Sequence, residues 1–252
     1  MWNKSFIIIV LASFALSCVA LWRASVGPSS ERLMETILEE FNKKPEVIAE
    51  ITVQGMRNLQ QKAENADLVR KQKKIKEKQA ELETNSVSPF IGNPNGDMVI
   101  TQFFDYHCGY CRKVDPIIEE LLKTDHSVRI VFKEYPIFGD ATLAKAALAA
   151  NKQKKYKEFH TSLMNAEANL SEDSLVGLAR SLGMDGAKFV KDMNSPAIEK
   201  ELKDNLALGE SLEISGTPCF IIGGTLLPGA IDLETIKKTL ASERLKKTNA
   251  PK

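Results

Sequence analysis

The segment VITQFFDYHCGYCRK, residues 99–113, governs the architecture of this 252-residue chain. The run from Met98 to Phe104 is short, β-branched and aromatic, which is typical of a central strand buried on both faces. Cys108 and Cys111 follow, and the apolar spacing from Val114 to Leu122 predicts a helix. We therefore expect the cysteine pair to lie on a strand-to-helix turn.

Further elements follow this turn. The predicted ones are a strand at 128–132, three or four amphipathic helices at about 141–213, a strand at 219–222, a hairpin partner at 225–227, and a helix capped by Asp232 that ends near Leu240. Together they predict an α/β domain over residues 85–245 that carries an inserted helical domain. A polar tail is expected at 246–252.

The first 22 residues have a different composition. Lys4 precedes an apolar run at 6–22, which predicts a signal peptide or a membrane anchor at residues 1–22. A weak lipoprotein-type site at Cys18 is a third possibility. Each outcome places the bulk of the protein outside the cytosol, where disulfides form and persist.

Residues 23–84 predict a helical oligomerisation or linker segment. A helix that begins near Pro45 would carry one narrow apolar stripe, formed by Ile48, Thr52, Met56, Leu59, Ala63 and Ala66. So thin a stripe cannot form a core alone, so it must pack on the main domain or on another copy of itself. We predict a homo-oligomer through residues 31–84. Beyond Ala66 the stripe decays, and a solvated helix or hinge is expected.

The chain has 34 basic and 33 acidic residues, a formal net charge of +1. This balance gives no field that would draw it onto a polyanion, so no nucleic acid partner is expected.

The Cys-x-x-Cys motif could be half of a zinc site, but a structural zinc site needs four ligands. The other candidates in the mature chain are Cys219, His107, His126 and His160, and they form no second short-spaced pair. Neither a metal nor another cofactor is expected. At a helix N-terminus the backbone amides favour the thiolate of the first cysteine. Cys108 is thus the expected nucleophile and Cys111 the resolving thiol.

These residues carry a family resemblance. The segment from Phe103 to Cys111, the Thr217-Pro218 dipeptide before a strand, and the helical block between them resemble the DsbA-like thioredoxin-fold family over about residues 88–240. Members with an N-terminal helical oligomerisation segment, the ScsC type, are the most similar. The resemblance implies a thioredoxin fold, a cis Pro218, and substrate docking at Thr217 and Pro218. It also implies the periplasm of a Gram-negative bacterium.

The direction of the chemistry is a further expectation. Gly109, Tyr110 and Thr217 are similar to their counterparts in the DsbC-type isomerases, whereas monomeric oxidases of the family usually carry Pro-His and a valine. We expect an isomerase or reductase that acts on misfolded exported proteins with cysteines and is recycled by a membrane redox partner. A disulfide-donating oxidase and a chaperone-like binding module are the alternatives.

Several positions remain open. Family members usually place a buried carboxylate six residues before the first cysteine, where this chain has Gln102. An amide cannot accept the thiol proton, so Glu134, Lys133 or water would have to substitute. His107 is expected to tune the thiolate. Cys219 is either a buried apolar residue or a third reactive thiol.

Overall fold

The computed structural model describes residues 32–33, 35–36, 39, 43, 45–83, 88–166 and 170–249. The chain divides into two compact units, Met1–Ala66 and Asp67–Lys252. The predicted export segment at 1–22, with Cys18, lies outside the described residues. Across the described ranges, no helix is both long and apolar enough to cross a membrane.

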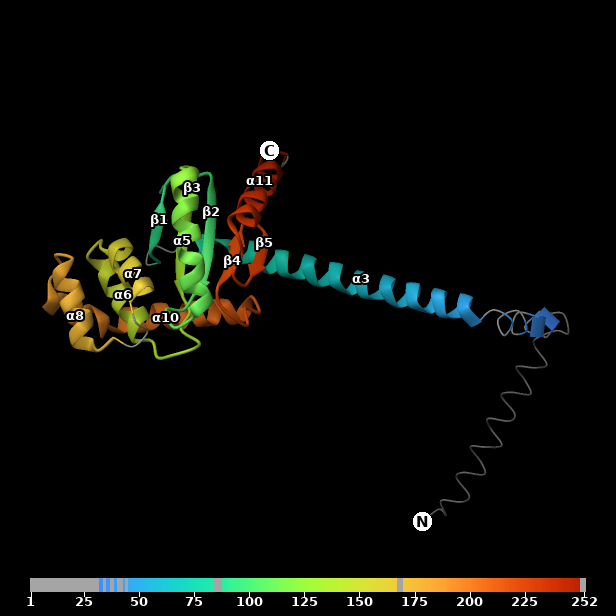
Figure 1. Ribbon diagram of the computed structural model, residues 1–252, viewed down its shortest axis with the longest axis horizontal. Helices are drawn as coiled ribbons and strands as arrows, with labels where there is room; N and C mark the ends of the chain where they lie inside the picture. The colour runs from blue at the N-terminus through green and yellow to red at the C-terminus, as the bar shows by residue number, and fades with distance from the viewer. Residues whose placement is uncertain are drawn as a thin grey trace, which may run out of the picture. The chain divides into compact units, whose positions relative to one another are not determined.

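A five-stranded mixed sheet forms the centre of the second unit (Figure 1). In spatial order the strands are β1 (Phe90–Gly92), β3 (Val128–Glu134), β2 (Met98–Phe104), β4 (Cys219–Ile222) and β5 (Thr225–Pro228). β2 and β3 are parallel, whereas the other pairs are antiparallel. β2 is central and is buried along nearly its whole length, which confirms the strand predicted from residues 98–104.

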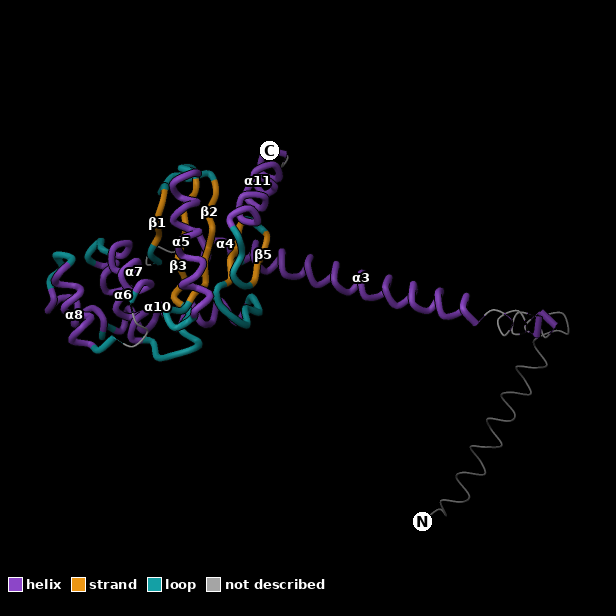
Figure 2. The backbone as a smooth tube through the Cα atoms, in the orientation of Figure 1, coloured by secondary structure: helices purple, strands orange, loops and turns teal. Residues whose placement is uncertain are grey.

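Helices follow the strands in the expected order. They are α5 (Gly109–Thr124), α6 (Thr142–Lys152), α7 (Tyr156–Asn165), α8 (Glu172–Ser181), α9 (Gly186–Met193), α10 (Pro196–Ser211) and α11 (Leu233–Asn249). The 141–213 region thus holds five helices rather than three or four. The additional break lies after Lys152, where Lys154 adopts a left-handed conformation with φ of 58°. Figure 2 shows α6, α7 and α8 grouped at one side of the sheet.

The last helix is longer than predicted. α11 continues to Asn249, so most of the predicted polar tail is helical. Arg244 on its outer turns donates hydrogen bonds to the carboxylates of Asp97 and Asp125, with the shortest contact to each at 2.8 Å. These ion pairs hold a segment whose composition alone resembles a tail.

Two apolar clusters cover the two faces of the sheet. Ile100, Phe104 and Phe132 contribute to a cluster with α5, α11 and the helical block. Phe103 and Ile221 contribute to the opposite cluster, which α10 covers. Because side chains alternate along a strand, each residue of β2 can be assigned to one of these faces.

The helical segment contains α3 (Pro45–Glu77) and α4 (Gln79–Glu83). In the second unit, Ile75 and Leu82 are buried in the cluster that α10 covers. Of the solvated helix or hinge expected after Ala66, the helix is present and most of its side chains are exposed, but Ile75 and Leu82 dock on the sheet, so a hinge is wrong for this stretch. In the first unit, Met56 and Leu59 are 66% and 69% exposed. Self-association through that part of the stripe stays a prediction.

Candidate active site

Cys108 and Cys111 lie where β2 passes into α5. Cys108 is the N-cap residue of α5, and its carbonyl oxygen accepts a hydrogen bond from the backbone N–H of Arg112 at 3.2 Å. Cys111 lies in the first turn of the helix and is completely buried, whereas Cys108 keeps 6% of its surface exposed. The unpaired amides of a helical first turn favour negative charge at the N-cap, where the Cys108 sulfur lies.

Thr217 contacts this turn from the loop before β4. The Sγ of Cys108 donates a hydrogen bond to the Thr217 carbonyl oxygen at 3.2 Å, and the peptide bond from Thr217 to Pro218 is cis, as predicted. Burial raises the pKa of Cys111 well above its ordinary value, and the nearby Asp105 backbone and Thr217 side chain partly oppose this rise. Thr217 thus binds the Cys108 sulfur through its carbonyl, and its buried hydroxyl, which has no hydrogen-bond partner within the described chain, lies near Cys111.

Cys219 is a third thiol, outside the pair formed by Cys108 and Cys111. Cys108, Cys111 and Cys219 are free thiols in the described chain. Cys219 is 2% exposed, and burial raises its pKa to about 12. This burial among apolar residues favours the alternative that Cys219 is a buried apolar residue.

Asp105 organises the loop before Cys108, a role that sequence reasoning missed. Its Oδ1 accepts hydrogen bonds from the backbone N–H and the ring Nδ1 of His107, at 2.9 and 3.2 Å. Its Oδ2 accepts from the backbone N–H groups of Ile137 and Phe138, at 2.9 and 2.7 Å. One buried carboxylate therefore joins the cysteine loop to the loop after β3. An aspartate directly after a central strand was the available signal.

His107 is half-buried between these loops. Gly139 lies so close that a Cβ there would stand 2.5 Å from the His107 Nδ1, so the approach requires glycine. The imidazole is thereby fixed next to the nucleophile. Its predicted role in tuning the thiolate stays a prediction.

Arg112 is the second residue that sequence reasoning missed. Its Nε donates to the Tyr106 carbonyl oxygen at 2.9 Å, and its Nη1 donates to the carbonyl oxygens of Met164 and Ala166 beyond the cysteine turn. This side chain fastens the active-site turn to the end of α7. Nothing in its place on an amphipathic helix distinguished it from a surface arginine.

The dipeptide between the cysteines faces outward. The Tyr110 ring is 63% exposed, and the Nζ of Lys113 lies 5.3 Å from its centroid. A Cβ at Gly109 would meet no atom within 4 Å. Both positions border the space from which a substrate would approach Cys108.

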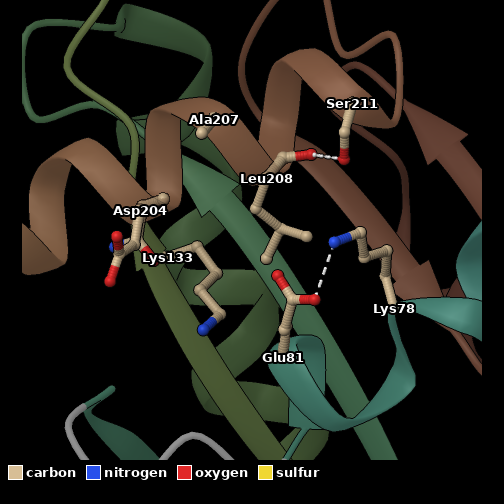
Figure 3. A pocket seen from close by; sticks show the side chains of 8 residues that line it. Lys78, Glu81, Lys133, Asp204, Ala207, Leu208 and Ser211 are labelled. Atoms are coloured by element: carbon tan, nitrogen blue, oxygen red, sulfur yellow. Dashed lines mark hydrogen bonds and ion pairs between the residues drawn. The ribbon is translucent and has the colours of Figure 1, made fainter.

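The predicted proton-relay residues do not form one cluster. Gln102 lies two residues from both Ile100 and Phe104 along β2, so all three side chains are on the same sheet face, which α5 covers. Glu134 lies on this face too. The Gln102 Oε1 is buried and has no hydrogen-bond partner in the described chain. Lys133 lies on the opposite face, in a groove between α4 and α10 (Figure 3).

Glu134 and Lys133 have separate surroundings. Glu134 accepts hydrogen bonds from the hydroxyls of Tyr156 and Tyr106, at 3.1 and 3.5 Å, and burial raises its pKa well above the ordinary value. The Nζ of Lys133 donates to the Ser88 hydroxyl at 2.7 Å, and burial lowers the pKa of this amine. The geometry therefore gives Lys133 no direct access to the cysteines.

Two cavities are lined by residues that adjoin or contact Cys108, namely Thr217 in one and His107 in the other. One, of about 190 Å³, is lined by Phe138, the 213–219 loop with Thr217 and Pro218, and part of the β5 hairpin. Another, of about 440 Å³, lies beside His107 and carries the side chains of Asp140 and Glu172.

Several known proteins are similar to this chain in sequence. Residues 99–241 match the family described as the DSBA-like thioredoxin domain. The thiol:disulfide interchange protein DsbA of Bordetella pertussis is 25% identical over 159 residues, which cover 60% of this chain and 76% of that protein. The chain also matches Na(+)/H(+) antiporters NhaA, such as that of Herminiimonas arsenicoxydans, at 24% identity over 155 residues, and spans about a quarter of their length.

Solved structures extend the comparison. A thioredoxin-like oxidoreductase from Silicibacter pomeroyi DSS-3 is 33% identical with a TM-score of 0.63, and the match covers 66% of this chain and 97% of that one. A Proteus mirabilis ScsC variant with a linker deletion has 24% identity and a TM-score of 0.66, with coverage of 88% and 98%. The latter match shows shared fold alone, and it extends into the N-terminal helices. The expected thioredoxin fold with inserted helices is confirmed.

Proposed function

This chain belongs to the DsbA-like thioredoxin domain family, and from that premise we propose that it exchanges disulfides in misfolded exported proteins as an isomerase or reductase. The observation that carries the proposal is the position of Cys108, at the N-cap of α5 with its sulfur 3.2 Å from the Thr217 carbonyl. Thr217, which this sulfur contacts, lines a cavity formed by the cis-proline loop. A nucleophilic thiol beside a surface that can hold an extended chain is what disulfide exchange requires.

The first step is a thiol exchange. The Cys108 thiolate attacks one sulfur of a substrate disulfide, and a bond forms between that sulfur and Cys108 Sγ. The substrate disulfide breaks, and its second sulfur leaves as a thiolate that takes a proton. The step starts and ends with one disulfide bond and one free thiolate, so no external electron acceptor is needed.

Two outcomes follow from this mixed disulfide. In isomerisation another substrate thiolate attacks the bound sulfur, forms a new substrate disulfide, and releases Cys108 as a thiolate. In reduction Cys111 loses its proton and attacks Cys108 Sγ, which forms the Cys108–Cys111 disulfide and frees a reduced substrate. The Thr217 hydroxyl would stabilise the Cys111 thiolate in this second route.

The direction of net exchange rests on resemblance and on the helical segment. Gly109, Tyr110 and Thr217 are similar to the residues of DsbC-type isomerases. The exposed side chains of Met56 and Leu59 offer an apolar stripe that a second copy could cover. An assembly would hold several active sites around one misfolded substrate, which suits isomerisation. The oxidase alternative is supported by the likeness to the DsbA of Bordetella pertussis.

The cellular setting follows from the same premise. The apolar run at 6–22 supports export, and the Cys108–Cys111 pair needs an oxidising compartment to meet substrate disulfides. We place the protein in the periplasm of a Gram-negative bacterium. Misfolded exported proteins with cysteines are its substrates, and a membrane thiol-disulfide protein keeps the pair reduced.

Refolding of scrambled ribonuclease tests the proposal. The purified protein in a glutathione buffer should restore ribonuclease activity, and a variant with Cys108→Ser and Cys111→Ser should not. A protein that readily oxidises reduced ribonuclease but does not repair scrambled ribonuclease would be an oxidase. If the double variant suppresses aggregation as well as the wild type while neither repairs disulfides, the chain is a binding module.

The oxidation state in cells gives an independent measurement. Acid quenching followed by alkylation should find Cys108 and Cys111 mostly reduced, because isomerase work needs a free thiolate at the start of each cycle. A mostly oxidised pair would support net disulfide donation instead.

A further inference from the structure

Glu213 occupies a backbone position that normally belongs to glycine. It follows Leu212, the C-cap residue of α10, and has a left-handed conformation with φ of 61°. The backbone N–H of Ile214 donates to the Gly209 carbonyl, and that of Glu213 donates to the Glu210 carbonyl, both at 2.9 Å. This pair of bonds is the Schellman motif, in which glycine is preferred at the left-handed residue because other residues are disfavoured there. The glutamate side chain must therefore have a compensating role.

That side chain is held by two cations of α3. Both terminal nitrogens of Arg70 donate to the Glu213 carboxylate, with Nη2 at 3.0 Å from Oε2. The Nζ of Lys74 donates to Oε1 at 2.7 Å. A bidentate arginine contact fixes the direction of the carboxylate as well as its distance, because the planar guanidinium matches the carboxylate geometry. The hydrogen bond from Arg70 makes the largest contribution and that from Lys74 the next largest, and together they lower the pKa of Glu213 to about 2.

Apolar contacts secure the same corner. Ile75 of α3 is 2% exposed and belongs to one cluster with Leu212, Ile214 and Cys219. The Tyr135 hydroxyl donates to the Ile214 carbonyl oxygen at 3.1 Å. The residues on both sides of Glu213 are thus buried, and the Glu213 side chain is left at the surface to receive Arg70 and Lys74.

The adjoining seam is polar. Between α4 and α10 lies a groove of about 320 Å³, bordered by the ion pair of Lys78 with Glu81 and by Asp204 and Ser211 (Figure 3). An open polar groove adds little apolar burial to the contact. The docking of α3 and α4 on this corner therefore depends on Ile75 of α3, Leu82 of α4 and the ion pairs at Glu213.

Glu213 also begins the loop that lines the proposed substrate groove. The cavity of about 190 Å³ is bordered in chain order by Glu213, Ile214, Ser215, Gly216, Thr217 and Pro218. We propose that Glu213 is a positioning residue for this groove, and that Arg70 and Lys74 of the linker helix hold it in place. The helical segment is then part of the substrate-binding machinery as well as a spacer. This inference rests on the proposed disulfide exchange.

Two variants separate positioning from folding. Glu213→Gln removes the charge and keeps the unfavourable backbone, whereas Glu213→Gly removes the charge and relieves the backbone. In both, KM for a disulfide-linked peptide should rise about two- to fivefold, as expected for loss of exposed ion pairs, while kcat changes less. Lys73→Gln is the matched control, because Lys73 pairs with Glu77 on the same helix, 3.9 Å away, and not with Glu213.

A merely structural role predicts a different pattern. Glu213→Gly should then match or exceed the wild type in melting temperature and keep the wild-type peptide KM, because glycine suits the left-handed residue. The inference predicts that Glu213→Gly keeps its melting temperature but still shows the raised peptide KM. An unchanged KM in this variant would overturn it.

A mutant cycle identifies the partner. The double variant Arg70→Gln with Lys74→Gln should raise peptide KM as much as Glu213→Gln, and adding Glu213→Gln to it should produce no further rise. Additive effects would overturn the link to α3. If the wild type does not react with the disulfide peptide at all, the proposed function itself fails. If it reacts and every variant keeps the wild-type KM, only the positioning inference fails.

Discussion

The Sγ of Cys108 lies 3.2 Å from the carbonyl oxygen of Thr217, although 109 positions separate the two residues in the chain. Burial raises the pKa of Cys111, and the side chain of the same threonine, whose buried hydroxyl has no other hydrogen-bond partner in the described chain, opposes this rise. The loop before β4 therefore contributes to both steps of exchange. Its carbonyl positions the attacking sulfur, and its hydroxyl supports ionisation of the resolving one.

Replacing Thr217 tests the second of these roles. Thr217→Val keeps the shape and removes the hydroxyl, so the pKa of Cys111 should rise further. Since a hydrogen bond to a charged group contributes about 1.5–3 kcal/mol, release of a bound peptide from Cys108 should slow by about tenfold or more. Rapid-mixing fluorescence with a labelled peptide measures this release. Thr217→Ser should release as the wild type does, and equal rates for Thr217→Val would contradict the role.

Gln102 offers a second test of resolution. Its Oε1 is buried without a partner on the sheet face that α5 covers, and an amide cannot accept the Cys111 proton. Gln102→Glu should therefore speed release of the mixed disulfide above pH 7, where more of the new carboxylate is ionised. Burial of that carboxylate should also lower the free energy of unfolding. The comparison is Gln102→Met, and an equal rate in the two variants would show that no base is needed there.

Glu134 should make stability depend on pH. Burial raises its pKa above the ordinary 4.5, so the folded protein favours the protonated acid. The resulting stabilisation is complete below the unfolded pKa and is lost as pH rises toward the folded pKa. Relative to Glu134→Gln, the wild type should lose up to about 1.4 kcal/mol of unfolding free energy per pH unit above pH 4.5. Urea titrations from pH 4 to 9 measure this difference, and parallel pH profiles would refute it.

The apolar stripe of α3 predicts an oligomer that charged substitutions in the stripe should dissociate. Met56→Glu together with Leu59→Glu places charge on the exposed apolar stripe, so sedimentation should show a smaller species than the wild type. Repair of scrambled ribonuclease should fall further than reaction with a simple disulfide peptide. Gln54→Glu, off the stripe on the same helix, should leave the assembly intact. A wild type that already sediments as a monomer would remove the basis for this prediction.

Local sequence signals were sufficient for the centre of the fold. The β-branched and aromatic run of β2 can hardly be anything but a buried strand, and the apolar spacing after Cys111 follows a helix. Pro218 before an apolar strand resembled the cis-proline of the family, and its peptide bond is cis. These features depend on neighbours in the chain, so the sequence carries them directly.

Features that depend on distant partners were missed. β1 has only three residues within a stretch of turn formers, and its strand character comes from pairing with β3. Asp105 and Arg112 bind backbone groups of segments that are far away in sequence. Ile75 stands alone among lysines, so its burial against the sheet follows from tertiary contacts and not from a pattern.

The central claim is that Cys108 attacks the substrate and Cys111 resolves the mixed disulfide. A trapping experiment tests this claim most directly. Reduced protein with Cys111→Ser is mixed with a disulfide-linked peptide, and the adduct is located by mass spectrometry of proteolytic fragments. The account predicts a persistent peptide bound through Cys108 and none bound to a Cys108→Ser variant treated in the same way. An adduct on Cys219, or equal adducts in both variants, would contradict it.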